Sequence, residues 1–169
     1  MDAVEVFNAM PAVRLRAELL ACCAAPAWAD AVARGRPYPD RAAVSTAADA
    51  ATRGLSWADV AQGLAAHPRI GERATGDDRA AAWSRREQST AAGSADGTTR
   101  AALTEANRAY EDRFGHVFLI FASGRTQDEI LAEARRRLDN DEQTERAVVA
   151  GELGAIAALR LERLLDGLG

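Results

Sequence analysis

The sequence contains no lysine, and this absence excludes the classes of chemistry that depend on a lysine amine. All 21 basic residues of the 169-residue chain are arginines. There is therefore no side chain to form a Schiff base with a carbonyl substrate, and no P-loop lysine to contact nucleotide phosphates. Arginine loses little side-chain entropy in a helix, and alanine, which occurs about 40 times, loses none. The composition favours an all-helical fold.

Cysteines and long apolar runs are also scarce. The two cysteines, Cys22 and Cys23, are adjacent, which fits neither a CxxC redox motif nor the spacing of zinc ligands. We interpret them as small core residues, as free cysteines commonly are. No apolar run approaches the roughly 20 residues that span a bilayer, and the N-terminus lacks the pattern of a signal peptide. We therefore expect a cytoplasmic protein that does not bind membranes.

An excess of positive charge is absent as well. The formal net charge is −4 at pH 7, whereas a module that binds duplex nucleic acid needs a basic surface to displace counterions from phosphates. We expect no nucleic-acid partner, and a small-molecule substrate is favoured instead. The length predicts one domain, residues 1–169, that buries about two thirds of its unfolded surface without a metal or a disulfide.

Apolar residues recur at helical spacing along most of the chain, with proline and glycine between the repeats. The expected fold is all-α, a compact bundle of about seven to nine helices. The expected helices cover residues 11–23, 28–33, 40–53, 56–67, 98–114, 126–138 and 141–165. Residues 69–83 and 91–97 are expected to be irregular. Val117–Ala122 is the one continuous apolar run with β-branched and aromatic character, so we expect a short extended segment there.

The sequence contains only two histidines, and these are the side chains that exchange protons most readily near neutral pH. His67 is followed by Pro68 and Gly71, which would fix the direction of the chain and let the backbone approach a ligand, presenting the imidazole at a pocket edge. The alternative is that His67 only ends a helix, where the macrodipole favours histidine. We interpret His116 as a solvated loop residue.

A second candidate is the segment Ser84–Gln88. Ser84 and Glu87 have the spacing of a capping box at the start of a helix. In the functional interpretation, the first turn of that helix offers free backbone N–H groups to a ligand, while Glu87 orients a histidine or shares its proton transfer. Capping and catalysis are compatible.

Arg160 lies on the apolar stripe of the last expected helix, four residues after Ile156. A guanidinium directed at a core needs an anion, because an unpaired buried charge is very costly. That anion is either an internal carboxylate, from Glu145 or Glu152, or the carboxylate of a ligand. Most other arginines, including those at 135–137, are expected to face water.

Taken together, these motifs resemble the OHCU decarboxylases, enzymes of urate breakdown that act on 2-oxo-4-hydroxy-4-carboxy-5-ureidoimidazoline. The resemblance extends from Phe7 to Leu165, and the order of the motifs makes it specific. The motifs are His67-Pro68-x-Ile70-Gly71, Ser84-x-x-Glu87-Gln88, Asn107-x-x-Tyr110, Phe114-Gly115-x-x-Phe118-x-Ile120-x-Ala122-x-Gly124, Glu145 with Glu152, and Ile156-x-x-x-Arg160-Leu161. His116 departs from the pattern, since an aromatic or aliphatic residue is common there.

The resemblance implies an all-helical homodimer that uses no metal and no organic cofactor and forms (S)-allantoin with loss of CO2. It implies that His67 and Glu87 are the catalytic acid–base residues, without deciding which delivers the final proton. Backbone groups of residues 118–122 would bond the polar edges of the substrate. The residues implied for substrate binding are Pro68, Ser84, Arg85, Arg86, Glu87, Gln88, Phe118, Leu119, Ile120, Phe121, Ala122 and Arg160.

Two other function classes compete with this hypothesis. A metal-dependent hydrolase would need clustered ligands, and two distant histidines without an HxH or HExxH motif make a poor set. A helical interaction or regulatory domain would use Ser84 and Glu87 only as a cap, and Arg160 only in an internal ion pair. A turnover assay separates the enzyme from the interaction domain.

Overall fold

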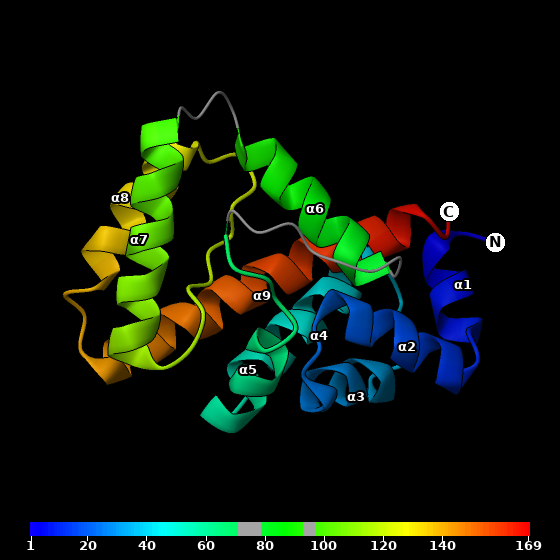
Figure 1. Ribbon diagram of the computed structural model, residues 1–169. Helices are drawn as coiled ribbons and strands as arrows, with labels where there is room; N and C mark the ends of the chain where they lie inside the picture. Colours follow the sequence, from blue (N-terminus) through cyan, green and yellow to red (C-terminus); the bar gives the residue numbers. More distant parts are fainter. Residues whose placement is uncertain (71–78, 93–96) are drawn as a thin grey trace. The chain divides into compact units, whose positions relative to one another are not determined.

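The computed structural model describes residues 1–70, 79–92 and 97–169, without the side chains of residues 79 and 88–92. Within these residues the chain forms nine helices and no strand, which confirms the predicted fold class (Figure 1). The helices are α1 Ala3–Ala9, α2 Ala12–Cys22, α3 Pro26–Arg34, α4 Arg41–Arg53, α5 Trp57–Leu64, α6 Arg79–Ala92, α7 Gly97–Phe114, α8 Gln127–Arg137 and α9 Glu142–Asp166. The chain divides into two compact units: a first unit, Met1–Gly63 with Ala150–Gly169, and a second unit, Leu64–Val149.

The first unit is built on consecutive helices, with α3 packed between α2 and α4. Helix α4 begins where the carboxylate of Asp40 accepts from the amide of Ala43 at 2.8 Å, and it ends at Arg53, directly before Gly54, as predicted. The indole of Trp28 is fully buried and donates to the carbonyl of Ala48 at 3.2 Å. Cys22 and Cys23 are buried thiols that are not joined in a disulfide, which confirms their interpretation as core residues.

The second unit has its core between α7 and α8, which lie side by side (Figure 1). Leu103, Ala106 and Tyr110 are buried on one face of α7, as their spacing predicts, and Phe114 packs against the same cluster. Helix α8 begins with the predicted capping box, in which the hydroxyl of Thr126 accepts from the amide of Glu129 at 3.1 Å. These local signals suffice to place both helices.

The prediction for α6 is partly wrong. Residues 79–83 are helical rather than irregular, as are residues 91, 92 and 97 of the expected loop. The three consecutive alanines before Trp83 have the highest helix propensity of any residue, and this outweighs the weak apolar periodicity of the segment. Residues 69 and 70 are irregular as expected, and residues 71–78 and 93–96 of the two segments lie outside the described residues.

Residues 117–122 form neither helix nor strand and are bounded by two glycines in left-handed conformation. Gly115 has φ +78° and Gly124 has φ +80°. Between them Phe118, Ile120 and Ala122 are buried in the core of the second unit. Leu119 is buried as well, so three consecutive side chains of this segment are covered. The segment is irregular rather than helical, and it is not paired into a sheet within the described residues.

We expect Gly115→Ala to lower the free energy of unfolding by about 1–2 kcal/mol, because Cβ at a left-handed residue crowds the following carbonyl oxygen. Among the described residues, no atom outside the local chain lies within 4 Å of a Cβ built there, so the cost is conformational. The control is Gly151→Ala, at an exposed and equally open position within α9, where alanine adds about 0.5–1 kcal/mol. Urea unfolding followed by circular dichroism measures both, and equal shifts of one sign would contradict the expectation.

Candidate active site

His67 lies in the second unit, three residues after the end of α5. Helix α5 begins with the predicted capping box of Ser56 and Asp59, and it ends at Leu64. The amide of His67 donates to the carbonyl of Leu64 at 3.0 Å, and Pro68 disfavours further helix. The side chain of His67 is half-buried, so the imidazole has both protein neighbours and access to solvent.

Helix α7 holds the residues that follow His67. The side-chain amide of Asn107 donates through Nδ2 to the carbonyl of Ile70 at 2.8 Å. One turn later, Glu111 accepts from Arg69 twice, at 2.5 Å from Nε and at 3.1 Å from Nη2. Ile70 also packs against the core of the second unit. The chain that leaves His67 is therefore fixed by polar and apolar contacts to one helix.

Ser84 and Glu87 lie on one face of α6, one turn apart, and both are buried with 6% and 8% of their surface exposed. Arg85 on the same helix is half-buried, and Arg86 is exposed. Because Ser84 lies inside α6, the predicted capping box is wrong, and its backbone N–H belongs to the helix rather than to a ligand. The side chain of Gln88, and all of Gly71, lie outside the described residues.

Buried polar groups need hydrogen-bond partners, and a carboxylate buried on the inner face of a helix is costly without them. Ser84 and Glu87 occupy positions that an apolar residue would fill in a helix serving only to cover a core. The inner face of α6 is therefore suited to polar contacts.

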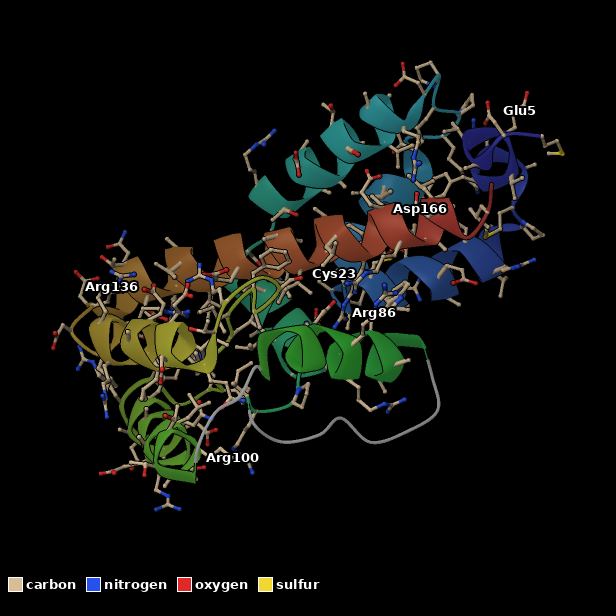
Figure 2. The ribbon with its side chains drawn as sticks, turned by 90° about the horizontal axis from the view of Figure 1, so that it is seen from above. Glu5, Cys23, Arg86, Arg100, Arg136 and Asp166 are labelled. Atoms are coloured by element: carbon tan, nitrogen blue, oxygen red, sulfur yellow. The ribbon has the colours of Figure 1, made fainter. Side chains whose placement is uncertain are left out.

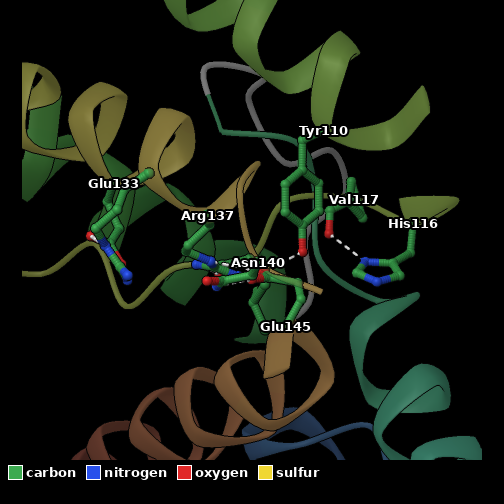
Figure 3. Close-up of polar contacts among 9 residues, drawn as sticks. Tyr110, His116, Val117, Glu133, Arg137, Asn140 and Glu145 are labelled. Atoms are coloured by element: carbon green, nitrogen blue, oxygen red, sulfur yellow. Dashed lines mark hydrogen bonds and ion pairs between the residues drawn. The ribbon is translucent and has the colours of Figure 1, made fainter. Parts of the chain in front are cut away.

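A buried polar cluster lies next to residues 117–122, and Figure 3 shows it. It consists of Arg137 on α8, Glu145 on α9, Tyr110 on α7, and Asn140 between α8 and α9; we call it the Arg137 network. Glu145 Oε1 accepts from Arg137 Nε and Nη2 at 2.8 and 2.5 Å, and from the hydroxyl of Tyr110 at 2.6 Å. Glu145 Oε2 accepts from Asn140 Nδ2 at 3.0 Å. The remaining edge of the guanidinium donates from Nη1 to the carbonyl of Leu119 at 2.7 Å.

The expectation that Arg137 mostly faces water is wrong, since its side chain is fully buried. Arg135 and Arg136 are exposed as expected, and Arg136 lies on the outer side of α8 (Figure 2). The signal was present in the sequence: Arg137 follows Ile130 by seven residues and Ala134 by three, which places it on the apolar stripe of α8.

The rings of Tyr110 and His116 are in contact next to the Arg137 network. Burial, and next the hydrogen bond to Glu145, raise the pKa of the Tyr110 phenol well above its ordinary value, so the hydroxyl remains a donor. His116 is half-buried, edge-on to the Tyr110 ring at 5.5 Å, and its Nδ1 donates to the carbonyl of Val117 at 3.1 Å (Figure 3). His116 lies in a loop, as interpreted, but it is half-buried against the rings of Tyr110 and Phe114 rather than solvated.

Arg160 lies in the first unit, on the buried stripe of α9, with 3% of its surface exposed. The inward direction predicted from its spacing is therefore confirmed. Its Nη1 donates to the carbonyl of Ala21 at 3.4 Å. Glu145, one of the two internal carboxylates considered for Arg160, accepts from Arg137 instead, within the Arg137 network.

Neither a metal cluster nor a membrane span is found in the described part of the chain. Across residues 1–70, 79–92 and 97–169, no three side chains of His, Cys, Asp or Glu are grouped so that they could hold a metal ion. None of the helices described there combines the length and apolar character needed to cross a bilayer. Burial raises the pKa of the Cys23 thiol, which makes this cysteine a poor thiolate ligand.

Comparison with known protein sequences finds similar proteins. One relative is the uric acid degradation bifunctional protein TTL of Arabidopsis thaliana, 31% identical over 147 residues, which are 86% of this chain and 45% of that protein. The chain thus spans less than half of the Arabidopsis protein. Another is the 2-oxo-4-hydroxy-4-carboxy-5-ureidoimidazoline decarboxylase of Haloferax volcanii, 31% identical over 139 residues, which are 80% of this chain and 79% of that protein.

Solved structures and a family model extend the comparison. The crystal structure of an OHCU decarboxylase in the presence of (S)-allantoin has a TM-score of 0.74 and 30% identity, covering 88% of this chain and 97% of its own. An (S)-allantoin synthase, with a TM-score of 0.71 and 17% identity over 95% of this chain and 53% of its own, shares the fold. The family model described as OHCU decarboxylase matches residues 8–162. The chain therefore belongs to the OHCU decarboxylase family.

Proposed function

We propose that this chain converts 2-oxo-4-hydroxy-4-carboxy-5-ureidoimidazoline to (S)-allantoin and CO2, a step of urate degradation. The observation that carries the proposal is the family match over residues 8–162, which includes every candidate residue from His67 to Arg160. The Haloferax volcanii decarboxylase, matched over most of its length, supports the same substrate. The crystal structure obtained with (S)-allantoin supports the product.

The chemistry of this substrate suits a chain without lysine. The carboxylate lies on a carbon next to a C=N bond, and that bond accepts the electron pair released when the C–C bond to CO2 breaks. The ring nitrogen then takes up a proton. The carbinol hydroxyl loses its proton to become a carbonyl, while a proton is added to the carbon that bears the ureido group. The enzyme needs to orient the substrate, move these protons and deliver the last one to a single face.

Within this proposal His67 and Glu87 are the acid–base residues, one of which delivers the final proton. Support comes from the half-buried imidazole of His67, from the burial of Glu87, and from the place of both in the second unit. Substrate contacts are assigned to Pro68, Ser84, Arg85, Arg86, Gln88 and residues 118–122. Arg160, in the first unit, is the residue assigned to an anionic or carbonyl group of the substrate.

The remaining expectations are proposals about organisation. The family match includes residues of both units, which supports a single OHCU decarboxylase-like domain over residues 1–169. No metal and no organic cofactor are required by the proposed chemistry. A cytoplasmic homodimer stays a prediction from the sequence.

The test generates the ureidoimidazoline in situ from urate with the two preceding enzymes and follows circular dichroism with and without this chain. We expect rapid appearance of the optical activity of (S)-allantoin only when the chain is present. A heat-inactivated sample serves as the control for added protein. Slow formation of racemic allantoin at the same rate in all samples would contradict the proposed function.

A further inference from the structure

The Arg137 network places a charge pair in the core of the second unit, where apolar packing would suffice for stability. Arg137 and Glu145 are both fully buried. Removing two charges from water is expensive, and replacing a buried ion pair with apolar residues of similar volume is often neutral or stabilising. Three helices each supply one member of the network. Stability alone therefore does not account for an arginine at this position.

The guanidinium of Arg137 joins two different partners with its planar set of donors. Two of its nitrogens donate to Glu145, and the third, Nη1, donates to the carbonyl of Leu119 at 2.7 Å. The same group lies over the Phe118 ring, 4.6 Å from its centroid. A rigid fork of this kind fixes direction as well as distance, which a lysine ammonium does not. Arg137 therefore holds both a backbone carbonyl and the neighbouring aromatic side chain.

Glu145 is itself held on both carboxylate oxygens. Tyr110 bonds the oxygen that faces Arg137, and Asn140 bonds the other oxygen (Figure 3). The carboxylate consequently has little freedom to rotate, and it sets the plane of the guanidinium. Side chains from α7 and α9 therefore fix the orientation of the Arg137 guanidinium. The guanidinium in turn bonds the carbonyl of Leu119 in the segment 117–122.

The bond to Leu119 has a consequence for the next residue. In a trans peptide the carbonyl of one residue and the N–H of the following residue lie in one plane and point in opposite directions. When Arg137 holds the carbonyl of Leu119, it also directs the N–H of Ile120 to the opposite side of the chain. Glycines with positive φ lie on both sides of this segment, and residues 117–122 belong to no helix or strand whose repeating hydrogen bonds would fix the peptide plane.

We infer that Arg137 is a positioning residue: it holds the Leu119–Ile120 peptide so that the N–H of Ile120 is presented to the substrate. This inference rests on the proposed function, in which residues 118–122 contact the ureidoimidazoline. The Arg137 side chain does not touch the substrate itself. It acts through one peptide group, and Glu145 and Tyr110 act through Arg137.

The test compares Arg137→Lys with Arg136→Lys, its exposed neighbour on α8. Lysine at 137 keeps a positive charge for Glu145 but cannot span Glu145 and Leu119 with a planar fork. We expect kcat/KM to fall about 10- to 100-fold, as a small misplacement of a positioning group does, together with a fall in the enantiomeric excess of allantoin. Arg136→Lys is expected to keep both values, because Arg136 pairs with Glu133 at the surface.

A second variant separates positioning from stability. In Arg137→Met/Glu145→Leu/Tyr110→Phe the buried charges and the buried hydroxyl are removed together, so the variant is expected to fold while the carbonyl of Leu119 loses its donor. The same 10- to 100-fold loss in kcat/KM is expected. If either this variant or Arg137→Lys folds and retains the wild-type kcat/KM and enantiomeric excess, Arg137 is not a positioning residue.

Amide hydrogen exchange makes the outcome independent of the proposed function. We expect faster exchange in residues 117–124 of both Arg137 variants, with exchange in α7 and α8 unchanged, and no such effect in Arg136→Lys. Unchanged exchange in residues 117–124 would overturn the inference even if the substrate is not turned over. A wild-type chain that fails to turn over the ureidoimidazoline would instead refute the proposed function, and the exchange data would still show whether Arg137 holds the segment.

Discussion

His67→Asn is expected to lower kcat by about two to four orders of magnitude, the usual contribution of a general acid or base. Asparagine keeps a polar side chain of similar size, but it does not exchange protons near neutral pH. The helices should be unaffected, because His67 lies outside α5 and its amide bond to Leu64 uses only the backbone. The rate at which optical activity appears, measured at saturating ureidoimidazoline, gives the effect.

His116→Asn is the matched control, since His116 is the one other histidine in the sequence. Its imidazole packs on aromatic rings and donates to Val117, and asparagine can replace that donor. We expect a loss of less than about tenfold, far below that of a general acid or base. Near-normal turnover by His67→Asn, or equal losses in both variants, would refute the role assigned to His67.

Glu145→Ala is expected to lower the free energy of unfolding by about 3–5 kcal/mol, because it leaves the guanidinium of Arg137 buried without a counter-charge. It also removes the acceptor of the Tyr110 hydroxyl. Against a total stability of about 5–15 kcal/mol for a domain, this loss is large enough to unfold part of the population at moderate temperature. Urea unfolding followed by tryptophan fluorescence or circular dichroism measures it.

An exposed ion pair on the same helix provides the control. Arg146 Nη2 and Glu142 Oε1 are 2.6 Å apart, but 44% and 70% of their side-chain surfaces are exposed. Glu142→Ala should therefore cost no more than about 0.5 kcal/mol. The apolar triple variant at 137, 145 and 110 should recover most of the stability lost by Glu145→Ala. If Glu145→Ala and Glu142→Ala unfold at the same urea concentration, breaking the buried ion pair between Arg137 and Glu145 does not cost the expected free energy of unfolding.

Local sequence signals predicted the helices well wherever a cap and an apolar stripe occurred together. Thr126 with Glu129 marked the start of α8, Asp40 marked the start of α4, and both side chains accept the expected amides. The spacing that directs Arg160 inward was also sufficient. Each of these features depends on residues within a few turns of one another, so each can be predicted from the sequence alone.

The errors came from propensity and from long-range contacts. Ser84 and Glu87 have the spacing of a cap, but the alanines before them extend α6 toward the N-terminus and place Ser84 inside the helix. The Arg137 network joins residues up to 35 positions apart, from Tyr110 to Glu145. Spacing shows that a charged residue faces inward, whereas its partner is chosen by packing between helices. The contact between Asn107 and Ile70 escaped prediction for the same reason.

The two adjacent cysteines allow opening of the first unit to be followed by thiol labelling. Cys22 and Cys23 have 0% and 2% of their surfaces exposed, and the sequence has no other cysteine. A thiol reagent can therefore react only when the first unit opens, and its rate under native conditions follows the population of that open form. The second unit contains no thiol, so its local opening is silent in the same experiment. Labelling kinetics can thus distinguish opening of the first unit from loosening around the candidate catalytic residues.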